Sequence, residues 1–239
     1  MTADAGQLLY LYSGCLFKVP DGVQPPKAGS LLFCRHLSFQ PDEHVLEIGT
    51  GIGLAAVLAA RAGCRVIATD VVPAAVECAR ENAILNGVAD RVEVRLGDCL
   101  APVVGLRFDV ICTSPPQMPT PAGRARQDAA AAADNGGVDG WALLDRVIDA
   151  APGHLRPGGR LIFTLFAFLG LKRAFRRLEA AGLDPTVLAR EVHAFPRLGY
   201  ERLDHIRALD VEATLPSTGL PETVERYLIQ GARPGARRV

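Results

Sequence analysis

From His44 onward, short apolar runs alternate along the chain with segments in which apolar residues recur at helical spacing. The runs predict five strands, at residues 44–49, 65–70, 91–98, 108–114 and 158–166. The segments between and after them predict four helices, at residues 53–63, 73–87, 140–155 and 171–182. Because strands that alternate with helices favour parallel pairing, this pattern predicts a mostly parallel sheet with helices on both faces.

The end of the chain departs from this alternation. We expect residues 185–192 and 224–234 to form the last two strands, paired antiparallel, with an insert at residues 193–223 between them. The insert should lie over the mouth of the sheet. The predicted fold class is therefore α/β, a single doubly wound and mostly parallel sheet of seven strands with a late insert.

Composition and charge narrow the classes of partner. The 239 residues include 26 Lys and Arg and 26 Asp and Glu, so the formal net charge is zero. A neutral chain lacks the basic surface of a duplex nucleic-acid binder, and no apolar run reaches the length of a membrane span. The six cysteines form no Cys-x-x-Cys pair and suit reduced thiols, so we expect a soluble cytoplasmic protein.

A glycine-rich turn follows the first predicted strand. Its pattern is Glu47-x-Gly49-x-Gly51-x-Gly53, whereas a dinucleotide-binding GxGxxG turn would need glycine at the position of Leu54. Glycines allow a tight turn and a close approach of the backbone to a ligand. The turn resembles the first motif of class I S-adenosylmethionine (SAM)-dependent methyltransferases. An acid there suits the sulfonium and ammonium groups of SAM better than a pyrophosphate.

Two further acids stand where this family places them. Asp70 ends the second strand, and the resemblance implies hydrogen bonds from both ribose hydroxyls, although nicotinamide enzymes place an acid similarly. Asp98 and Cys99 follow the third strand, where the resemblance puts the adenine, with Asp98 accepting from its amino group. Each acid alone would pass for a helix cap or a loop residue. Together, in register with the glycines, they predict SAM binding.

The fourth predicted strand ends in Ser114-Pro115-Pro116-Gln117. Proline fixes its own φ, has no N–H and pushes the preceding residue to extended geometry, so this corner is rigid and rich in acceptors. It can accept hydrogen bonds from an NH₂ group and hold the nitrogen in line with a sulfonium carbon. Alone, a Pro-Pro pair is more often a structural turn. Its place after the fourth strand of a SAM-type domain favours catalysis by positioning.

These residues resemble the (Asn/Asp/Ser)-Pro-Pro-(Tyr/Phe) motif of methyltransferases that act on planar nitrogens, among them the release-factor glutamine methyltransferases. The resemblance to that group covers roughly residues 20–165. Upstream, a proline-containing segment with Ser30 in place of a threonine is similar to the one that lines the family's active site. The resemblance thus implies an N-terminal extension at residues 1–40 that lines the active site and contributes Ser30 to the SAM site, followed by a SAM-binding methyltransferase domain at residues 41–239.

Departures from that family alter the expected acceptor. Ser114 stands where an asparagine accepts a bond from the target amide, and Gln117 replaces the aromatic residue that packs on the planar substrate. Only about forty residues precede the first strand, so we expect the helical recognition domain of the bacterial enzymes to be absent. These differences predict a smaller, more polar acceptor.

The sequence therefore predicts a SAM-dependent N-methyltransferase acting on a planar or amino nitrogen of a small metabolite, such as an amino acid or guanidino compound, with neither nucleic acid nor membrane as partner. The alternative is methylation of a glutamine amide in a protein. Two other classes stay open: a nicotinamide oxidoreductase, disfavoured by Leu54, and a SAM-binding partner without catalysis. His154, His193 and His205 lack metal-ligand spacing, so no metal site is expected, and a proton-accepting role for either late histidine is a minor alternative.

Overall fold

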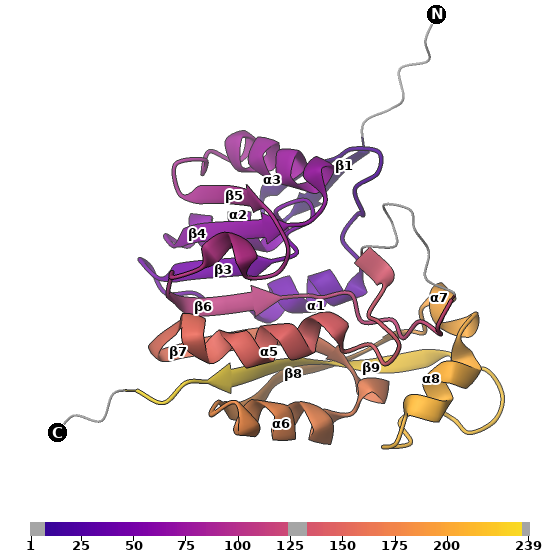
Figure 1. Ribbon diagram of the computed structural model, residues 1–239. Coiled ribbons are helices and arrows are strands. Elements are labelled where there is room, and N and C mark those ends of the chain that lie inside the picture. The colour runs from indigo at the N-terminus through magenta and orange to yellow at the C-terminus, as the bar shows by residue number, and fades with distance from the viewer. Residues whose placement is uncertain (1–7, 124–132, 236–239) are drawn as a thin grey trace, which may run out of the picture.

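The computed structural model describes residues 8–123 and 133–235. Through them runs one sheet of seven strands in the order β5-β4-β3-β6-β7-β9-β8 (Figure 1). The strands are β3 (His44–Ile48), β4 (Arg65–Asp70), β5 (Val92–Leu96), β6 (Phe108–Thr113), β7 (Leu155–Phe166), β8 (Asp184–Ala194) and β9 (Thr223–Ala232). β3 to β7 pair in parallel, and β9 runs antiparallel to its neighbours β7 and β8. The predicted α/β fold class is confirmed.

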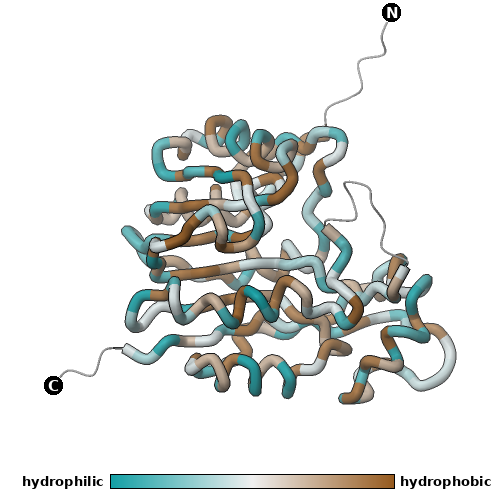
Figure 2. Tube along the Cα trace, in the orientation of Figure 1, coloured by the Kyte–Doolittle hydropathy of each residue, from teal (hydrophilic) through white to brown (hydrophobic). Residues whose placement is uncertain are grey.

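Helices cover both faces of this sheet (Figure 1). They are α1 (Ala28–His36), α2 (Leu54–Arg61) and α3 (Pro73–Leu85) on one face, and α5 (Ala142–His154) and α6 (Leu171–Ala180) on the other. The alternation of side chains along a strand explains this arrangement, since Val45 of β3 packs in the first layer and Leu46 in the second. The central strands are apolar on both faces, and polar positions gather on the helices and loops around them (Figure 2).

The late insert is shorter than the sequence predicted, because β8 continues to Ala194 and pairs with β9 along its whole length. What remains between the two strands folds into α7 (Arg197–Tyr200) and α8 (Leu203–Leu209). Two 3-10 turns, Ala101–Val103 and Ala167–Leu169, follow β5 and β7. Within the described part of the chain, no helix combines the length and the apolar composition that crossing a membrane requires.

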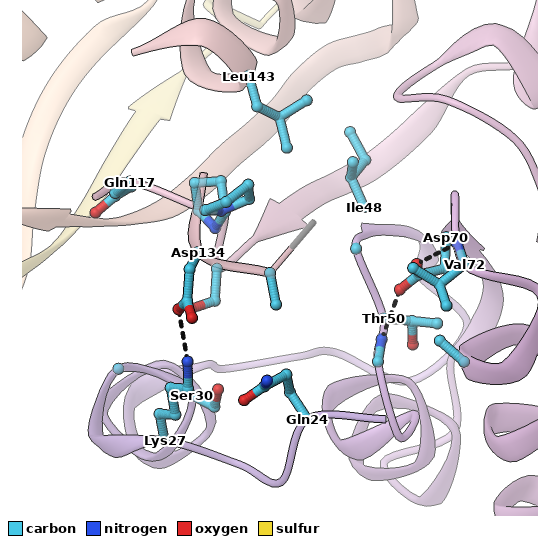
Figure 3. A pocket seen from close by; sticks show the side chains of 18 of the residues that line it. Gln24, Lys27, Ser30, Ile48, Thr50, Asp70, Val72, Gln117, Asp134 and Leu143 are labelled. Atoms are coloured by element: carbon cyan, nitrogen blue, oxygen red, sulfur yellow. Dashed lines mark hydrogen bonds and ion pairs between the residues drawn. The ribbon is translucent and has the colours of Figure 1, made fainter. Parts of the chain in front are cut away.

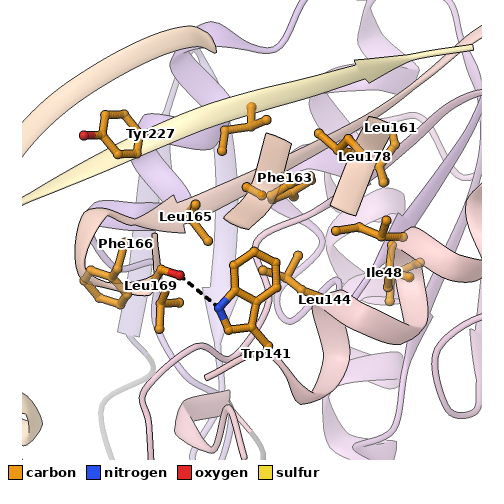
Figure 4. Packing of buried hydrophobic residues seen from close by; sticks show 14 of the residues in the cluster. Ile48, Trp141, Leu144, Leu161, Phe163, Leu165, Phe166, Leu169, Leu178 and Tyr227 are labelled. Carbon is orange, nitrogen blue, oxygen red and sulfur yellow. Dashed lines mark hydrogen bonds between the residues drawn. The ribbon is translucent and has the colours of Figure 1, made fainter. Parts of the chain in front are cut away.

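Trp141 is 1% exposed and fixes the start of α5 (Figure 4). Its indole Nε1 donates to the Leu169 carbonyl at 3.1 Å, and the Arg173 guanidinium lies 4.3 Å from the ring centroid. A buried indole N–H needs such a partner. The two contacts tie the loop that leads into α5 to the end of β7, so both segments have fixed positions beside the carboxyl ends of the strands.

An N-terminal hairpin was not predicted by the sequence analysis, and neither were the helices α1, α7 and α8. The strands of the hairpin are β1 (Leu8–Tyr12) and β2 (Cys15–Val19), joined by Ser13 and Gly14, both with positive φ, as expected of a two-residue hairpin turn. The outer edge of β2 pairs with two side-chain amides of α3. Asn82 exchanges bonds of 2.8 and 3.0 Å with the Lys18 backbone, and Asn86 does the same with Leu16.

Replacing Asn82 should destabilise the fold more than replacing Asn86. The Asn82 amide is fully buried and also donates to the Ile52 carbonyl at 2.9 Å, so Asn82→Ala leaves several buried groups without partners. We expect the free energy of unfolding to fall by roughly 2–4 kcal/mol. The matched change Asn86→Ala, at the exposed end of the same contact, should cost about 1 kcal/mol. Urea denaturation measures both, and equal losses would contradict this assignment.

Candidate active site

A cavity of about 1080 Å³ opens at the carboxyl ends of the parallel strands, where doubly wound sheets bind their ligands. Its volume slightly exceeds that of ordinary small-molecule pockets, which leaves room for a cofactor and part of a second substrate. All but one of the site residues predicted from the sequence line it: Ser30, Glu47, Gly49, Gly51, Asp70, Asp98, Cys99, Ser114, Pro115, Pro116 and Gln117. The exception is Gly53, the last residue of the glycine turn (residues 47–53), which faces Ala79 of α3.

The three glycines of the glycine turn are needed for two different reasons. All have positive φ, of +75° at Gly49, +55° at Gly51 and +82° at Gly53, which strains any other residue. A Cβ at Gly49 or Gly51 would meet nothing within 4 Å, so the backbone faces open space there. A Cβ at Gly53 would lie 3.1 Å from the Ala79 Cβ, so this glycine also lets α2 approach α3.

Glu47, predicted to face a cationic ligand, is a buried part of the turn itself. Its Oε2 accepts from the Thr50 hydroxyl at 2.7 Å and from the Ala56 amide at 3.0 Å. Burial raises the pKa of this carboxyl to about 8, so it is largely protonated at neutral pH in the free protein. A positive charge brought next to it would lower that pKa again, which couples cation binding here to proton release.

Asp70 stands at the end of β4 and holds the same turn from the other side (Figure 3). Its Oδ2 accepts from the Gly51 amide and its Oδ1 from the Val72 amide, both at 2.9 Å. A carboxylate has about four acceptor positions, so each oxygen keeps capacity for a further donor from the cavity. This geometry fits a vicinal pair of ribose hydroxyls.

Asp98 has a partner that the sequence analysis missed. The guanidinium of Arg146, on α5, binds it through two hydrogen bonds of 3.1 and 2.8 Å at the rim of the cavity. Nothing in the sequence distinguishes Arg146 from other charged positions of that helix. The neighbouring Cys99 is buried and has a φ of +54°, unusual for a residue with a side chain. An adenine amino group would therefore share Asp98 with Arg146.

The proline corner (residues 114–117) is fastened to the end of β7. The Ser114 and Thr164 hydroxyls are 3.2 Å apart. Gln117 is 3% exposed, its Nε2 donates to the Thr164 carbonyl and its Oε1 accepts from the Phe166 amide at 3.2 Å. Figure 3 shows this side chain directed away from the other labelled residues of the cavity. The Gln117 amide thus supports the corner from behind and adds no polar group to the open space in front of it.

Two further segments contribute to the cavity wall, and the sequence analysis predicted the place of only the second. Lys27, before α1, forms an ion pair of 2.6 Å with Asp134, which follows the loop after the corner (Figure 3). The insert supplies four lining residues, Pro196, Arg197, Leu198 and Glu201, in agreement with its expected place over the mouth of the sheet. Residues 124–132 of the long loop lie outside the described residues. No histidine occurs among the described lining residues, so the proton-accepting role weighed for His193 or His205 has no geometric support.

The buried carboxyl of Glu47 should make stability depend on pH. In the unfolded chain its pKa returns towards 4.5, so between that value and about 8 unfolding releases a proton. The free energy of unfolding therefore falls as pH rises through this range, by at most about 1.4 kcal/mol per pH unit for one group. In Glu47→Gln, which cannot ionise, thermal denaturation from pH 5 to pH 8 should show a shallower fall than in the wild type. An unchanged slope would mean that Glu47 is ionised in the folded protein.

Comparisons with known proteins agree with this geometry. The family model described as methyltransferase small domain matches residues 24–181. A Methanocaldococcus jannaschii protein, provisionally named a protein N5-glutamine methyltransferase, is 33% identical over 178 residues, 74% of this chain and 89% of that protein. The release factor glutamine methyltransferase of Cereibacter sphaeroides is 37% identical over 201 residues, 81% of this chain and 71% of that protein.

The likeness extends to solved structures. The precorrin-6y C5,15-methyltransferase of Geobacter metallireducens superposes with a TM-score of 0.56, at 17% identity, over 91% of this chain and 94% of that chain. Sequence identity at this level supports a shared fold and nothing further. The family uses SAM as methyl donor, which excludes the nicotinamide alternative. The chain belongs to the methyltransferase small domain family of class I SAM-dependent N-methyltransferases.

Proposed function

We propose that this enzyme transfers the methyl group of SAM to the side-chain amide nitrogen of a glutamine in a protein. The observation that carries the proposal is the similarity to two relatives named for glutamine methylation, at 33% and 37% identity over 89% and 71% of their lengths. The Ser-Pro-Pro corner at the wall of the cavity agrees with an acceptor of this planar kind.

The prediction that a small metabolite is a likelier acceptor than a protein is wrong. Two relatives of this chain are named as methyltransferases of glutamine in proteins, one of them for release factors. The prediction depended on Ser114, on Gln117, whose amide was expected to make the acceptor pocket more polar, and on the expected absence of a recognition domain. Because that amide donates to Thr164 and accepts from Phe166 of β7, the glutamine at this position is directed to the sheet and gives no support to a polar metabolite as acceptor.

The residues of the cavity fit SAM. Gly49 and Gly51 offer open backbone, Asp70 offers carboxylate oxygens at the position for a ribose, and Asp98 and Cys99 border the place for an adenine. Ser30 lines the wall opposite, with other residues of the N-terminal extension. When bound, SAM supplies an electrophilic methyl group on a sulfonium. The acids around the turn suit that charge.

The corner would act on the acceptor amide by positioning it. An amide nitrogen is a weak nucleophile because its lone pair is delocalised onto the carbonyl. Backbone oxygens of Ser114 and Pro115 can accept its N–H hydrogens, which holds the nitrogen in line and keeps electron density on it. Gln117 and Thr164 keep the corner from moving, since both bind it to β7. Once the N–C bond forms, the amide loses one proton to solvent.

The N-terminal extension would complete the acceptor side. Residues 22–27 and the first turns of α1 line the cavity, and the Lys27–Asp134 ion pair joins them to the segment that follows the corner. This agrees with the expected role of residues 1–40 in lining the active site. An acceptor loop that enters between these segments would exclude water from the cavity. Exclusion of water strengthens the hydrogen bonds at the corner.

Methyl transfer to glutamine tests the proposal directly. Purified release factors of Cereibacter sphaeroides, incubated with the enzyme and SAM, should gain one methyl group on a glutamine side chain, located by tandem mass spectrometry. Ser114→Ala combined with Pro115→Ala should lower kcat by about 100-fold or more, as removal of positioning groups does. The matched pair Pro216→Ala with Ser217→Ala, exposed in the insert, should leave kcat unchanged. Methylation at another residue type would refute the proposed function.

Asp70 should contribute strongly to cofactor affinity. Asp70→Ala removes the acceptor for two hydroxyls and releases the Gly51 amide, so the Kd of S-adenosylhomocysteine should rise about tenfold or more. Isothermal titration calorimetry measures this value. Asp184→Ala, an exposed acid at the start of β8, is the control and should bind as the wild type does. Equal affinity of both variants would show that the ribose lies elsewhere.

A further inference from the structure

Arg226, on β9, lines the cavity without an anionic partner in the described part of the chain. Its guanidinium carbon lies over the Phe166 ring, 3.5 Å from the ring centroid, in a cation–π contact. Burial lowers the pKa of Arg226 to about 10, which still leaves it charged at neutral pH. A guanidinium carries five N–H donors, and burying one without a counter-charge is unfavourable unless a ligand supplies it.

The nearest acid along the sheet is already engaged. Glu191 of β8 is the cross-strand neighbour of Arg226, but its carboxylate binds the Arg35 guanidinium and lies 3.0 Å from His36, both on α1. His193 does not add a second charge, because burial and the nearby Arg226 lower its pKa. Neither Glu191 nor His193 therefore neutralises the charge of Arg226.

The chain makes room for this cation. Gly29, in the first turn of α1, lies against the guanidinium, and a Cβ at that position would collide with Nη1. Glycine inside a helix is less favourable than alanine, and the φ of Gly29 is not in the region that demands it. A side chain at this position would have to displace the Arg226 guanidinium from where it lies. Two segments far apart in sequence combine to place one charge at the cavity.

The strand registers put Arg226 on the acceptor side of the cavity. Thr113 pairs with Phe163, which sets Pro116 level with Phe166, and Phe166 pairs with Arg226. The sheet order therefore runs from the ribose acid on β4, through the glycine turn after β3 and the corner after β6, to Arg226 on β9. With neighbouring strands about 4.8 Å apart, Arg226 lies roughly 10 Å beyond the corner, away from the nucleoside end. A residue next to an acceptor glutamine can reach that far.

We propose that Arg226 binds a carboxylate of the acceptor protein, from an aspartate or glutamate close in sequence to the glutamine that is methylated. The inference rests on the proposed function and adds a substrate preference to it. The planar guanidinium can bind both oxygens of a carboxylate at once, and its cation–π contact with Phe166 holds it in place while leaving N–H groups free. A partly buried cation without a counter-charge favours an anion over a neutral carbonyl.

Two capped peptides test this inference without turnover. Both have a central glutamine, followed by glutamate in one and by glutamine in the other, and both are titrated into the enzyme saturated with S-adenosylhomocysteine. We expect the acidic peptide to bind about tenfold more tightly or better, a preference that Arg226→Gln removes and Arg226→Lys retains in part. Equal binding of the two peptides to the wild type would overturn the proposal. A loss of affinity for both in Arg226→Gln would assign the arginine to a carbonyl and also overturn it.

A second pair of variants tests the room made for the guanidinium. Gly29→Ala should displace it and lower the preference for the acidic peptide. Gly153→Ala, in α5 with nothing within 4 Å of the added Cβ, should retain the preference. The Tm of the ligand-free Arg226→Gln variant should equal or exceed that of the wild type, because an unpaired charge is removed. A lower Tm with an unchanged peptide preference would give Arg226 a role in the fold and overturn the inference.

The cofactor also carries a carboxylate, so its contribution needs a separate measurement. S-adenosylhomocysteine has this group and 5′-methylthioadenosine lacks it. If Arg226→Gln weakens the first and not the second, the carboxylate is the cofactor's and the proposal is wrong; equal affinities in variant and wild type support it. Because these are binding measurements, a preference for the acidic peptide together with no methyl transfer to glutamine would refute the proposed function and support the carboxylate site.

Discussion

Two carboxyl groups hold the glycine turn, and the shape of the cavity depends on them. A turn made of glycines has no side chains with which to fix itself, so Glu47 spans it from β3 to the first turn of α2, and Asp70 holds Gly51 from β4. The Thr69 carbonyl adds bonds from Gly49 and Thr50, at 2.8 and 3.0 Å. The same groups that would meet a cationic nucleoside thus already give the backbone its conformation.

Periodicity along the chain was enough to predict the sheet, because each central strand is apolar on both faces and each helix on one. The glycine turn and the proline corner could also be predicted from the sequence. Their chemistry depends on backbone conformation, and glycine and proline indicate that conformation directly. The hairpin at residues 8–19 was missed, since its partner is a pair of asparagine amides on α3 and not another strand.

The direction in which a side chain points was harder to predict from the sequence. Gln117 stands next to the prolines in the sequence, which suggested contact with the acceptor, yet the open end of β7 takes both ends of its amide. Arg226 is one of several polar residues of β9, and nothing in the local sequence distinguishes it. Its importance depends on a glycine in α1, on the ring of Phe166 and on Glu191 being bound elsewhere. Such relations arise only when distant segments are folded together.

Asn82 joins the hairpin to the glycine turn by hydrogen bonds, in addition to the hydrophobic cluster that both share. One buried amide binds the backbone of the hairpin through Lys18 and the backbone of the glycine turn through Ile52. Loosening of the amino-terminal strands would be transmitted to the nucleoside end of the cavity through this side chain. A protein that binds the exposed leucines of β1, at residues 8, 9 and 11, would therefore change the conformation of the cofactor site without contacting it.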